Sequence, residues 1–168
     1  MTAQIDLPLS TLPPTAQGAI EAFLIGGGFR YSVEEIPGGL ETIALGTIPG
    51  FGKLALTFTL WEEGRHLTVG VDHGVRLAGP TRDETLEFLA RLNGTTAFCA
   101  FGISPTTETV VWKTGYCTDL GSPVTLELVE ALLLQLLRSD QKATPCLCRV
   151  VEGFESAAEA MEWFWSGL

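Results

Sequence analysis

The sequence predicts an α+β domain in which an antiparallel β-sheet meander is flanked by helices, in the order α-β-β-β-(β)-α-β-β-α-α. From Phe29 to Ala78, apolar residues alternate with polar ones and turn residues recur at short intervals, which is the pattern of short antiparallel strands. Helical periodicity dominates from residue 123 and again from Phe154.

The 168 residues, of which 46% are hydrophobic, are enough for a single domain spanning 1–168. We expect an extended leader over residues 1–12 and a C-terminal amphipathic helix over 154–168. No repeat, linker or low-complexity segment marks a second domain.

The first helix is predicted to begin at Pro13-Pro14, because proline is tolerated in a first helical turn. It is predicted to end at Gly26-Gly27-Gly28, because glycine adopts the left-handed conformation of helix ends without a steric penalty. Glycine-rich loops that hold phosphate run from a strand into a helix, whereas here a helix precedes the strand that begins at Phe29. We therefore interpret the glycines as a helix stop. The expected apolar stripe is Ala16, Ile20, Phe23 and Leu24.

Turns of the meander are predicted at residues 37–39, 49–52 and 62–64. Within 54–61, large apolar residues alternate with Ala and Thr, so one face of that strand should be buried and the other lightly covered. The same alternation follows in Leu67, Val69 and Val71.

The second helix is predicted to begin with a capping box, in which Thr81 is the N-cap and Glu84 bonds back to the Thr81 amide. Asn93-Gly94 should end it with residues that accept a positive φ. Two further strands are expected at about 96–103 and 107–114, joined through residues 104–106. The expected apolar edge of the helix is Leu86, Leu89 and Leu92.

The longest helix is predicted to begin with Ser122 as N-cap and Pro123 at its first position. Residues 139–145 are expected to form a loop, and 147–151 fit either a strand or a helix. The inward positions of the helix are Leu126, Val129, Leu132, Leu133, Leu136 and Leu137.

The formal charge of -10, from 20 acidic and 10 basic residues, argues against nucleic acid and anionic membranes as partners, because both require a positive surface. The N-terminus lacks the features of a signal peptide, and no segment approaches the apolar length of a membrane span. Four cysteines are too few and too unevenly spread for a disulfide scaffold. A soluble, cytoplasmic protein is therefore expected.

Catalytic chemistry usually requires a base, and the only histidines are His66 and His73. They lie seven residues apart, which places them on opposite faces of an unbroken strand. We expect two solvated polar residues, no catalytic or cofactor-binding residue and no enzymatic activity. The alternative is an enzyme or small-ligand binder whose site is assembled from scattered residues: His66, Asp72, His73 and Asp119.

Cys146 and Cys148, with Cys99 and Cys117, are the only residues that resemble a metal-binding set. Structural zinc sites pair cysteines two to four residues apart on each side, whereas Cys99 and Cys117 are isolated. We interpret all four as small buried thiols and expect no metal and no cofactor.

The C-terminal segment carries an apolar stripe at helical spacing, which either packs on its own domain or docks onto a second copy or another protein. Trp163 points away from the stripe and lies among Glu155, Glu159 and Glu162, where an aromatic side chain has no core to fill. The predicted protein-contact residues are Trp163, Met161 and Trp165. The stripe consists of Phe154, Ala157, Ala158, Met161, Phe164, Trp165 and Leu168.

Several core and turn segments carry a family resemblance. They are Phe23-Leu24 before Gly28-Phe29, Leu92-Asn93-Gly94 leading through Phe98, Val110-Val111-Trp112-Lys113, and a closing segment with Pro145, Leu147, Val150, Gly153 and Glu159-Ala160. With the element order, they resemble the YbjN-type domain, a relative in fold of the type III secretion chaperones. The resemblance covers most of residues 16–162. It implies an α+β domain, often paired as a homodimer, that binds proteins and performs no chemistry.

The sequence thus favours a non-catalytic, chaperone-like or regulatory domain that binds a protein partner of unknown identity and forms a possible homodimer. Chaperones of this shape hold a partner segment along sheet edges and apolar grooves. A third hypothesis is a structural subunit of a larger assembly, for which a large obligate interface would be diagnostic.

Overall fold

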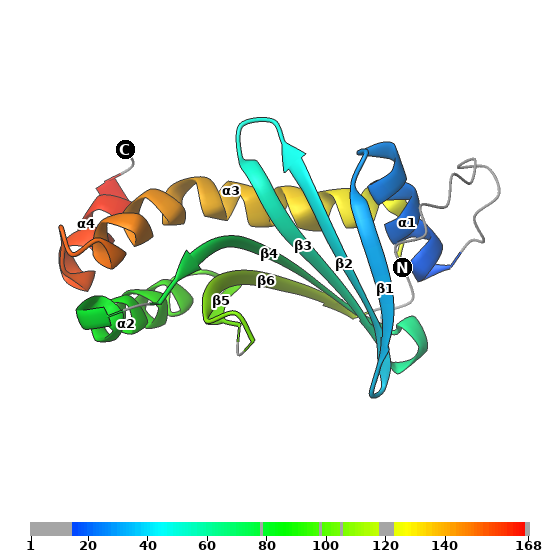
Figure 1. The fold of residues 1–168 in the computed structure, drawn as a ribbon, viewed down its shortest axis with the longest axis horizontal. Coiled ribbons are helices and arrows are strands. Elements are labelled where there is room, and N and C mark those ends of the chain that lie inside the picture. Colours follow the sequence, from blue (N-terminus) through cyan, green and yellow to red (C-terminus); the bar gives the residue numbers. More distant parts are fainter. Residues whose placement is uncertain (1–14, 78, 98, 105, 118–122, 167–168) are drawn as a thin grey trace. The chain divides into compact units, whose positions relative to one another are not determined.

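The computed structural model describes residues 15–77, 79–97, 99–104, 106–117 and 123–166, without the side chains of Glu63 and His73 (Figure 1). The predicted leader over 1–12, Pro13-Pro14 and the predicted N-cap Ser122 lie outside these residues. The described residues form two compact units. The first lies within 1–71 and 114–134, and the second within 72–113 and 135–168.

The described strands form a six-stranded sheet in the order β1-β2-β3-β4-β6-β5. This confirms the predicted α+β class and the predicted order of helices and strands. Short 3-10 turns lie at Glu62–Gly64 and Gly79–Thr81. The elements are α1 (Ala16–Gly26), β1 (Arg30–Ile36), β2 (Gly39–Ile48), β3 (Gly52–Trp61), β4 (His66–Arg76), α2 (Arg82–Asn93), β5 (Ala100–Ile103), β6 (Thr109–Cys117), α3 (Leu126–Val151) and α4 (Ala157–Ser166).

In the first unit, α1 ends where the glycines predict. Gly28 has a φ of 68°, which is left-handed, and its N–H donates to the Ile25 carbonyl at 3.1 Å. The Phe29 N–H donates to the Leu24 carbonyl at 2.9 Å, which completes the Schellman pattern of a helix C-terminus. The Phe29 ring then stacks on Phe23, with centroids 5.8 Å apart, and so fixes the direction in which the chain enters β1.

The meander follows the predicted turns, and β1, β2 and β3 pair antiparallel in register. The alternation of β3 is also confirmed, because its large apolar residues are buried on one face: Leu54, Leu56, Phe58 and Leu60. Helix α1 covers this face, since the Phe23 and Phe58 rings lie 6.0 Å apart and the Gln17 amide donates to the Thr42 hydroxyl at 3.3 Å.

In the second unit, side chains tie the strands and α2 together. The Thr109 hydroxyl on β6 donates to Asp72 Oδ2 on β4 at 2.6 Å. Asn93 donates to the Phe101 carbonyl at 2.8 Å and accepts from the Phe101 N–H at 2.7 Å, which fixes the end of α2 beside β5. The expected positive φ at this helix end is wrong, because Gly94 has a φ of -71°. Asn93 serves instead as a clamp on the strand.

The predicted start of the long helix is wrong. Helix α3 begins at Leu126 and not at Pro123. The Thr125 hydroxyl accepts from the Leu128 N–H at 3.3 Å, and the Thr125 carbonyl accepts from the Val129 N–H. The N-cap is therefore Thr125, whose side chain can reach the first turn.

The predicted loop over 139–145 is also wrong, because α3 continues unbroken to Val151 with Pro145 inside it. Residues 147–151 are therefore helical. An interior proline costs a helix about 3 kcal/mol. The buried stripe continues past it, however, and burying each large apolar side chain contributes about 1.5–3 kcal/mol, so packing outweighs the local penalty. The buried apolar positions that flank Pro145 are Ala143 before it and Cys146, Leu147 and Val150 after it.

Candidate protein-interaction surface

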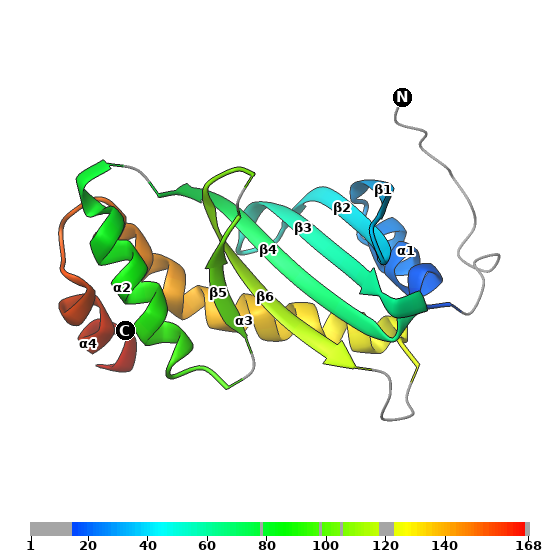
Figure 2. The same cartoon turned by 90° about the horizontal axis from the view of Figure 1, so that it is seen from below.

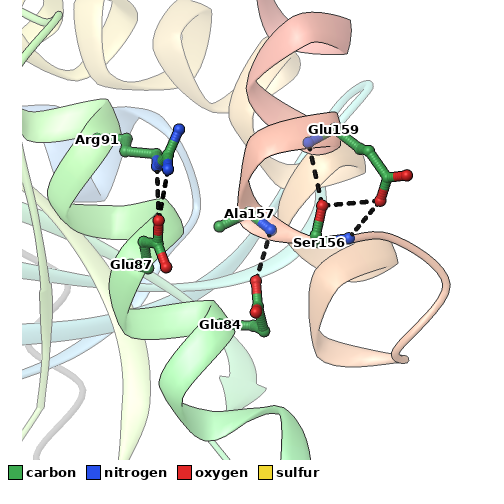
Figure 3. Close-up of polar contacts among 6 residues, drawn as sticks. All are labelled: Glu84, Glu87, Arg91, Ser156, Ala157 and Glu159. Atoms are coloured by element: carbon green, nitrogen blue, oxygen red, sulfur yellow. Dashed lines mark hydrogen bonds and ion pairs between the residues drawn. The ribbon is translucent and has the colours of Figure 1, made fainter.

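Helix α4 of the second unit begins with a capping box. The Ser156 N–H donates to Glu159 Oε2 at 2.8 Å, and the Glu159 N–H donates to the Ser156 hydroxyl oxygen at 3.3 Å (Figure 3). These reciprocal bonds satisfy amides that a helix N-terminus otherwise leaves unpaired. The Ser-x-x-Glu spacing at 156–159 carries the same signature as Thr81–Glu84, and it could have been found in the sequence.

The capping box predicted for α2 is wrong, although the helix begins where expected. Thr81 stands at the N-cap without a capping bond from its side chain, and its hydroxyl donates to the Val151 carbonyl at 2.9 Å. Glu84 Oε2 accepts from the Ala157 N–H at 2.8 Å (Figure 3). The first turn of α2 thus caps the first turn of α4, which lies beside it in both views (Figures 1 and 2).

The connection between α3 and α4 is held by Arg149. Its Nε and Nη2 both lie 2.6 Å from Glu155 Oε1, and its guanidinium lies 4.7 Å from the centroid of the Trp163 ring. The Glu155 side chain is only 10% exposed, so its charge requires a close cation. Gly153, with a φ of 76°, turns the chain out of α3. One side chain of α3 therefore contacts both the connector and α4.

The three predicted contact residues differ in their exposure to solvent. Met161 is 7% exposed and packs in the second unit, whereas Trp163 is 38% and Trp165 63% exposed. Whether any of them contacts a partner stays a prediction. Trp163 does have an intramolecular neighbour that the sequence analysis missed, the guanidinium of Arg149. That pairing joins residues on two helices, and no local spacing signals it.

The predicted C-terminal stripe holds only in part. Ala157 and Met161 are buried, together with Ala160, which was outside the predicted set. Phe154 is 71% exposed, because α4 begins three residues later and Phe154 belongs to the connector. The predicted members Ala158 and Trp165 are also exposed, and Leu168 lies outside the described residues. Burial is thus confined to the first turns of α4, next to α2.

We use the name aromatic surface for the exposed side chains of Phe154 in the connector and of Trp163 and Trp165, which project from different sides of α4. All three are exposed although the segment that carries them is fixed by the capping and ion-pair contacts above. The Trp165 ring packs edge-on against Phe164, with centroids 5.4 Å apart, which restricts its orientation. The exposed carboxylates nearest to it in the sequence are Glu152, Glu159 and Glu162, while the partly exposed guanidinium of Arg149 lies over the Trp163 ring.

The residues of the scattered-site hypothesis have local partners where they are described. His66 Nε2 lies 3.4 Å from Glu62 Oε2. In the second unit, Asp72 accepts from the Gly74 N–H at 2.6 Å and from the Thr109 hydroxyl. Asp119 and the side chain of His73 lie outside the described part of the chain. The described residues thus show only these local contacts of His66 and Asp72, and the scattered-site hypothesis stays a prediction.

The thiols of α3 are held in their protonated form. Burial raises the pKa of Cys146 and of Cys148 above the ordinary value, and the neighbouring carboxylates Glu155 and Glu152, respectively, act in the same direction. The Cys146 thiol donates to the Lys142 carbonyl at 3.4 Å. Among the residues that the structure describes, no group of three or more His, Cys, Asp or Glu side chains could hold a metal ion.

Fold and surface together define an α+β protein with an antiparallel sheet and an exposed aromatic surface on its C-terminal helix. Comparison with protein-family models, with curated proteins and with solved structures yields no match. The resemblance to YbjN-type domains stays a prediction. No helix in the described ranges has the length and apolarity to cross a membrane.

Replacing Glu84 with Ala should destabilise α4, because the Ala157 amide loses its carboxylate acceptor (Figure 3). Loss of such a cap costs about 1 kcal/mol. Glu87→Ala is the matched control on the same helix, since Glu87 pairs only across the surface with Arg91 and should cost at most about 0.5 kcal/mol. Amide hydrogen exchange at 157–161 measures the effect. Equal exchange in the two variants would contradict the cap.

The Ser156 N–H and hydroxyl lower the pKa of Glu159 below its ordinary value of 4.5. A lowered folded-state pKa means that the ionised carboxylate stabilises α4 above about pH 4.5, and that this contribution is lost as the pH falls through the lowered value. An NMR titration of Glu159 should give a pKa that rises toward 4.5 in Ser156→Ala. An identical titration curve in wild type and variant would rule out the side-chain contribution.

Proposed function

We propose that this protein is a non-catalytic protein-binding domain, chaperone-like or regulatory, which engages its partner through the aromatic surface. The observation that carries the proposal is that α4 and its connector are held in place by polar contacts while three large aromatic side chains stay exposed. Exposed tryptophans on an ordered element are favourable anchors, because they bury much apolar area at little entropic cost.

The charge around the aromatic surface favours a partner segment that combines apolar and basic residues. Glu152, Glu159 and Glu162 are exposed near the aromatic residues in sequence, and residues 152–168 contain no Lys or Arg. Carboxylates at the rim of an interface steer a cationic partner and raise its association rate. The overall charge of -10 acts in the same direction at longer range.

A non-catalytic role agrees with the chemistry of the described residues. The two α3 thiols have raised pKa values, so little thiolate is present near neutral pH. His66 and Asp72 bond to neighbours within their own units. A homodimer is a further part of the proposal.

The test begins by capturing the partner from an extract of the native cell, identifying it and titrating it in purified form by calorimetry. Trp165→Ala should raise the Kd by about 10-fold or more, the loss typical of an interface hot spot. Leu134→Ala removes an apolar side chain of α3 that is also exposed, and it should leave the Kd unchanged. Raising the salt concentration should slow association.

If Trp165→Ala and Phe154→Ala each bind the purified partner as tightly as wild type does, the proposed surface is contradicted. Circular dichroism of each variant checks that α4 remains folded. Detectable turnover of a small molecule that survives loss of Trp165 and Phe154 would favour the alternative of an enzyme or small-ligand binder.

A further inference from the structure

A second exposed apolar surface lies in the first unit, on the sheet face that α1 does not cover. Residues paired across antiparallel strands point to the same face. The Thr42 hydroxyl of β2 bonds to Gln17 of α1, and both Thr42 and Ala44 are buried. Because side chains alternate along a strand, Ile43 and Leu45 lie on the opposite side. We call this side of β1–β3 the outer face.

The strand register sorts the outer face into a basic end, an aliphatic middle and an acidic end. Successive outward positions of a strand are two residues, or roughly 7 Å, apart. The face therefore consists of levels that run across β1, β2 and β3. The levels are Arg30, Leu45 and Ala55, then Ser32, Ile43 and Thr57, then Glu34, Glu41 and Thr59, with Lys53 opposite Thr47 one level before the first.

Leu45 and Ile43 form the aliphatic middle. Leu45 is 61% exposed, and Ile43 beside it is also exposed. Their partners on β3 are the small side chains of Ala55 and Thr57. Outward-facing positions of an antiparallel sheet are normally polar. Two large aliphatic side chains above small neighbours therefore leave room for an apposed apolar segment.

The charged residues of the outer face are separated by sign. Arg30 and Lys53 lie toward one end, and Glu34 pairs directly with Glu41 at the other, where opposed carboxylates are destabilising. Arg30 and Glu34 are four residues apart on β1, which is roughly 13 Å along an extended strand. Within the described ranges, none of these four side chains forms an ion pair. A ligand with a carboxylate at one end and a cation at the other would neutralise both ends of the face.

An amphipathic helix fits the spacing of this face. Residues four positions apart lie about 6 Å apart along a helix, close to the distance between levels. Residues seven or eight positions apart span about 10–12 Å, close to the separation of Arg30 and Glu34. A helix also satisfies its own backbone hydrogen bonds, whereas an extended segment stacked on a sheet face would leave its N–H and C=O groups unpaired. The outer face therefore favours a helix over an extended peptide.

The charges set the direction of such a helix. Acidic residues stabilise the N-terminal turn of a helix, and basic residues stabilise the C-terminal turn. The acidic turn therefore belongs over Arg30 and Lys53, and the basic turn belongs over Glu34 and Glu41. Because β2 runs from the acidic end of the face to the basic end, this helix lies antiparallel to β2.

We propose that the outer face of β1–β3 binds an amphipathic helix of a partner protein, laid antiparallel to β2. An acidic residue at position i of the helix pairs with Arg30 and Lys53. Aliphatic residues at i+3 and i+4 pack on Leu45 and Ile43, and a basic residue at i+7 lies over the opposed carboxylates. The outer face shares no residue with the aromatic surface, so this binding goes beyond the proposed function.

Fluorescence anisotropy with two labelled synthetic peptides tests the proposal on the full chain. Each peptide is rich in alanine and glutamine and about 18 residues long, which favours a helix. The first carries Glu at i, Leu at i+3 and i+4, and Lys at i+7. The control peptide keeps the leucines and moves the Glu and Lys to i+2 and i+9, on the opposite side of the helix, so that net charge and charge order are unchanged.

The first peptide should bind with a Kd at least about 10-fold lower than that of the control peptide. The absence of saturable binding of the first peptide would overturn the proposal. Equal Kd values for the two peptides would also overturn it, because the charges of the outer face would then have no role.

Two pairs of variants locate the binding site. Leu45→Thr keeps a residue favourable for strands and should raise the Kd of the first peptide by about 10-fold or more, whereas Leu134→Gln on α3 should leave it unchanged. Arg30→Glu should raise this Kd by at least about 3-fold. Arg138→Glu, which makes the same charge change at an exposed position of α3, should not. Wild-type affinity in Leu45→Thr, or equal effects of the two arginine variants, would overturn the proposal.

Trp165→Ala separates the outer face from the aromatic surface, and this variant should bind the first peptide as wild type does. Peptide binding that is lost in Trp165→Ala but retained in Leu45→Thr would overturn the proposal while leaving the protein-binding role of α4 intact. Sedimentation velocity covers the remaining occupant. Self-association of the wild type that Leu45→Thr abolishes would assign the outer face to a second copy and overturn the proposal.

Discussion

The C-terminal part of the second unit depends on the guanidinium of Arg149. It holds the largely buried carboxylate of Glu155 through two contacts to one oxygen and covers the ring of Trp163. A buried carboxylate without a cation is costly, whereas a guanidinium can bind a carboxylate and pack against an aromatic ring at once. Because Glu155 lies in the connector and Trp163 on α4, one side chain sets where the chain turns and how α4 is rotated about its axis. The contacts from α2, Thr81 to Val151 and Glu84 to Ala157, act on the same junction.

This rotation decides which side chains of α4 face solvent. The buried positions are small or flexible, Ala157, Ala160 and Met161, while Trp163 and Trp165 stay accessible. Polar contacts therefore fix the position of α4, a role that a broad buried apolar stripe has in other helices. The aromatic side chains consequently remain exposed to solvent. In the first unit the equivalent division is set by strand register, which buries Ala44 and exposes Leu45. Each unit thus carries exposed apolar side chains of its own.

Much of the fold could be predicted because its signals are local. Alternation in β3 and the Gly28 helix stop depend only on neighbouring residues and on backbone geometry. The prediction of a loop over 139–145 was wrong because the polar composition and Pro145 suggested a break in the helix. The burial that keeps α3 continuous depends on tertiary contacts, which local sequence does not show. The prediction that Glu84 caps its own helix was wrong for a related reason, because the amide that Glu84 accepts from belongs to a residue 73 positions away. The aromatic surface was found in part, through Trp163 and Trp165. Arg149 was missed because its two partners lie beyond a helix end.

The most direct test of this account is amide hydrogen exchange across α3 and α4 in wild type and in Arg149→Met, which keeps an apolar stem and removes the charge. Residues 157–166 should lose protection while 129–147 keep theirs, and Trp163 fluorescence should shift to the red as its ring becomes more exposed. Unchanged protection in α4 would show that apolar packing alone positions the helix, and it would contradict the role assigned to Arg149.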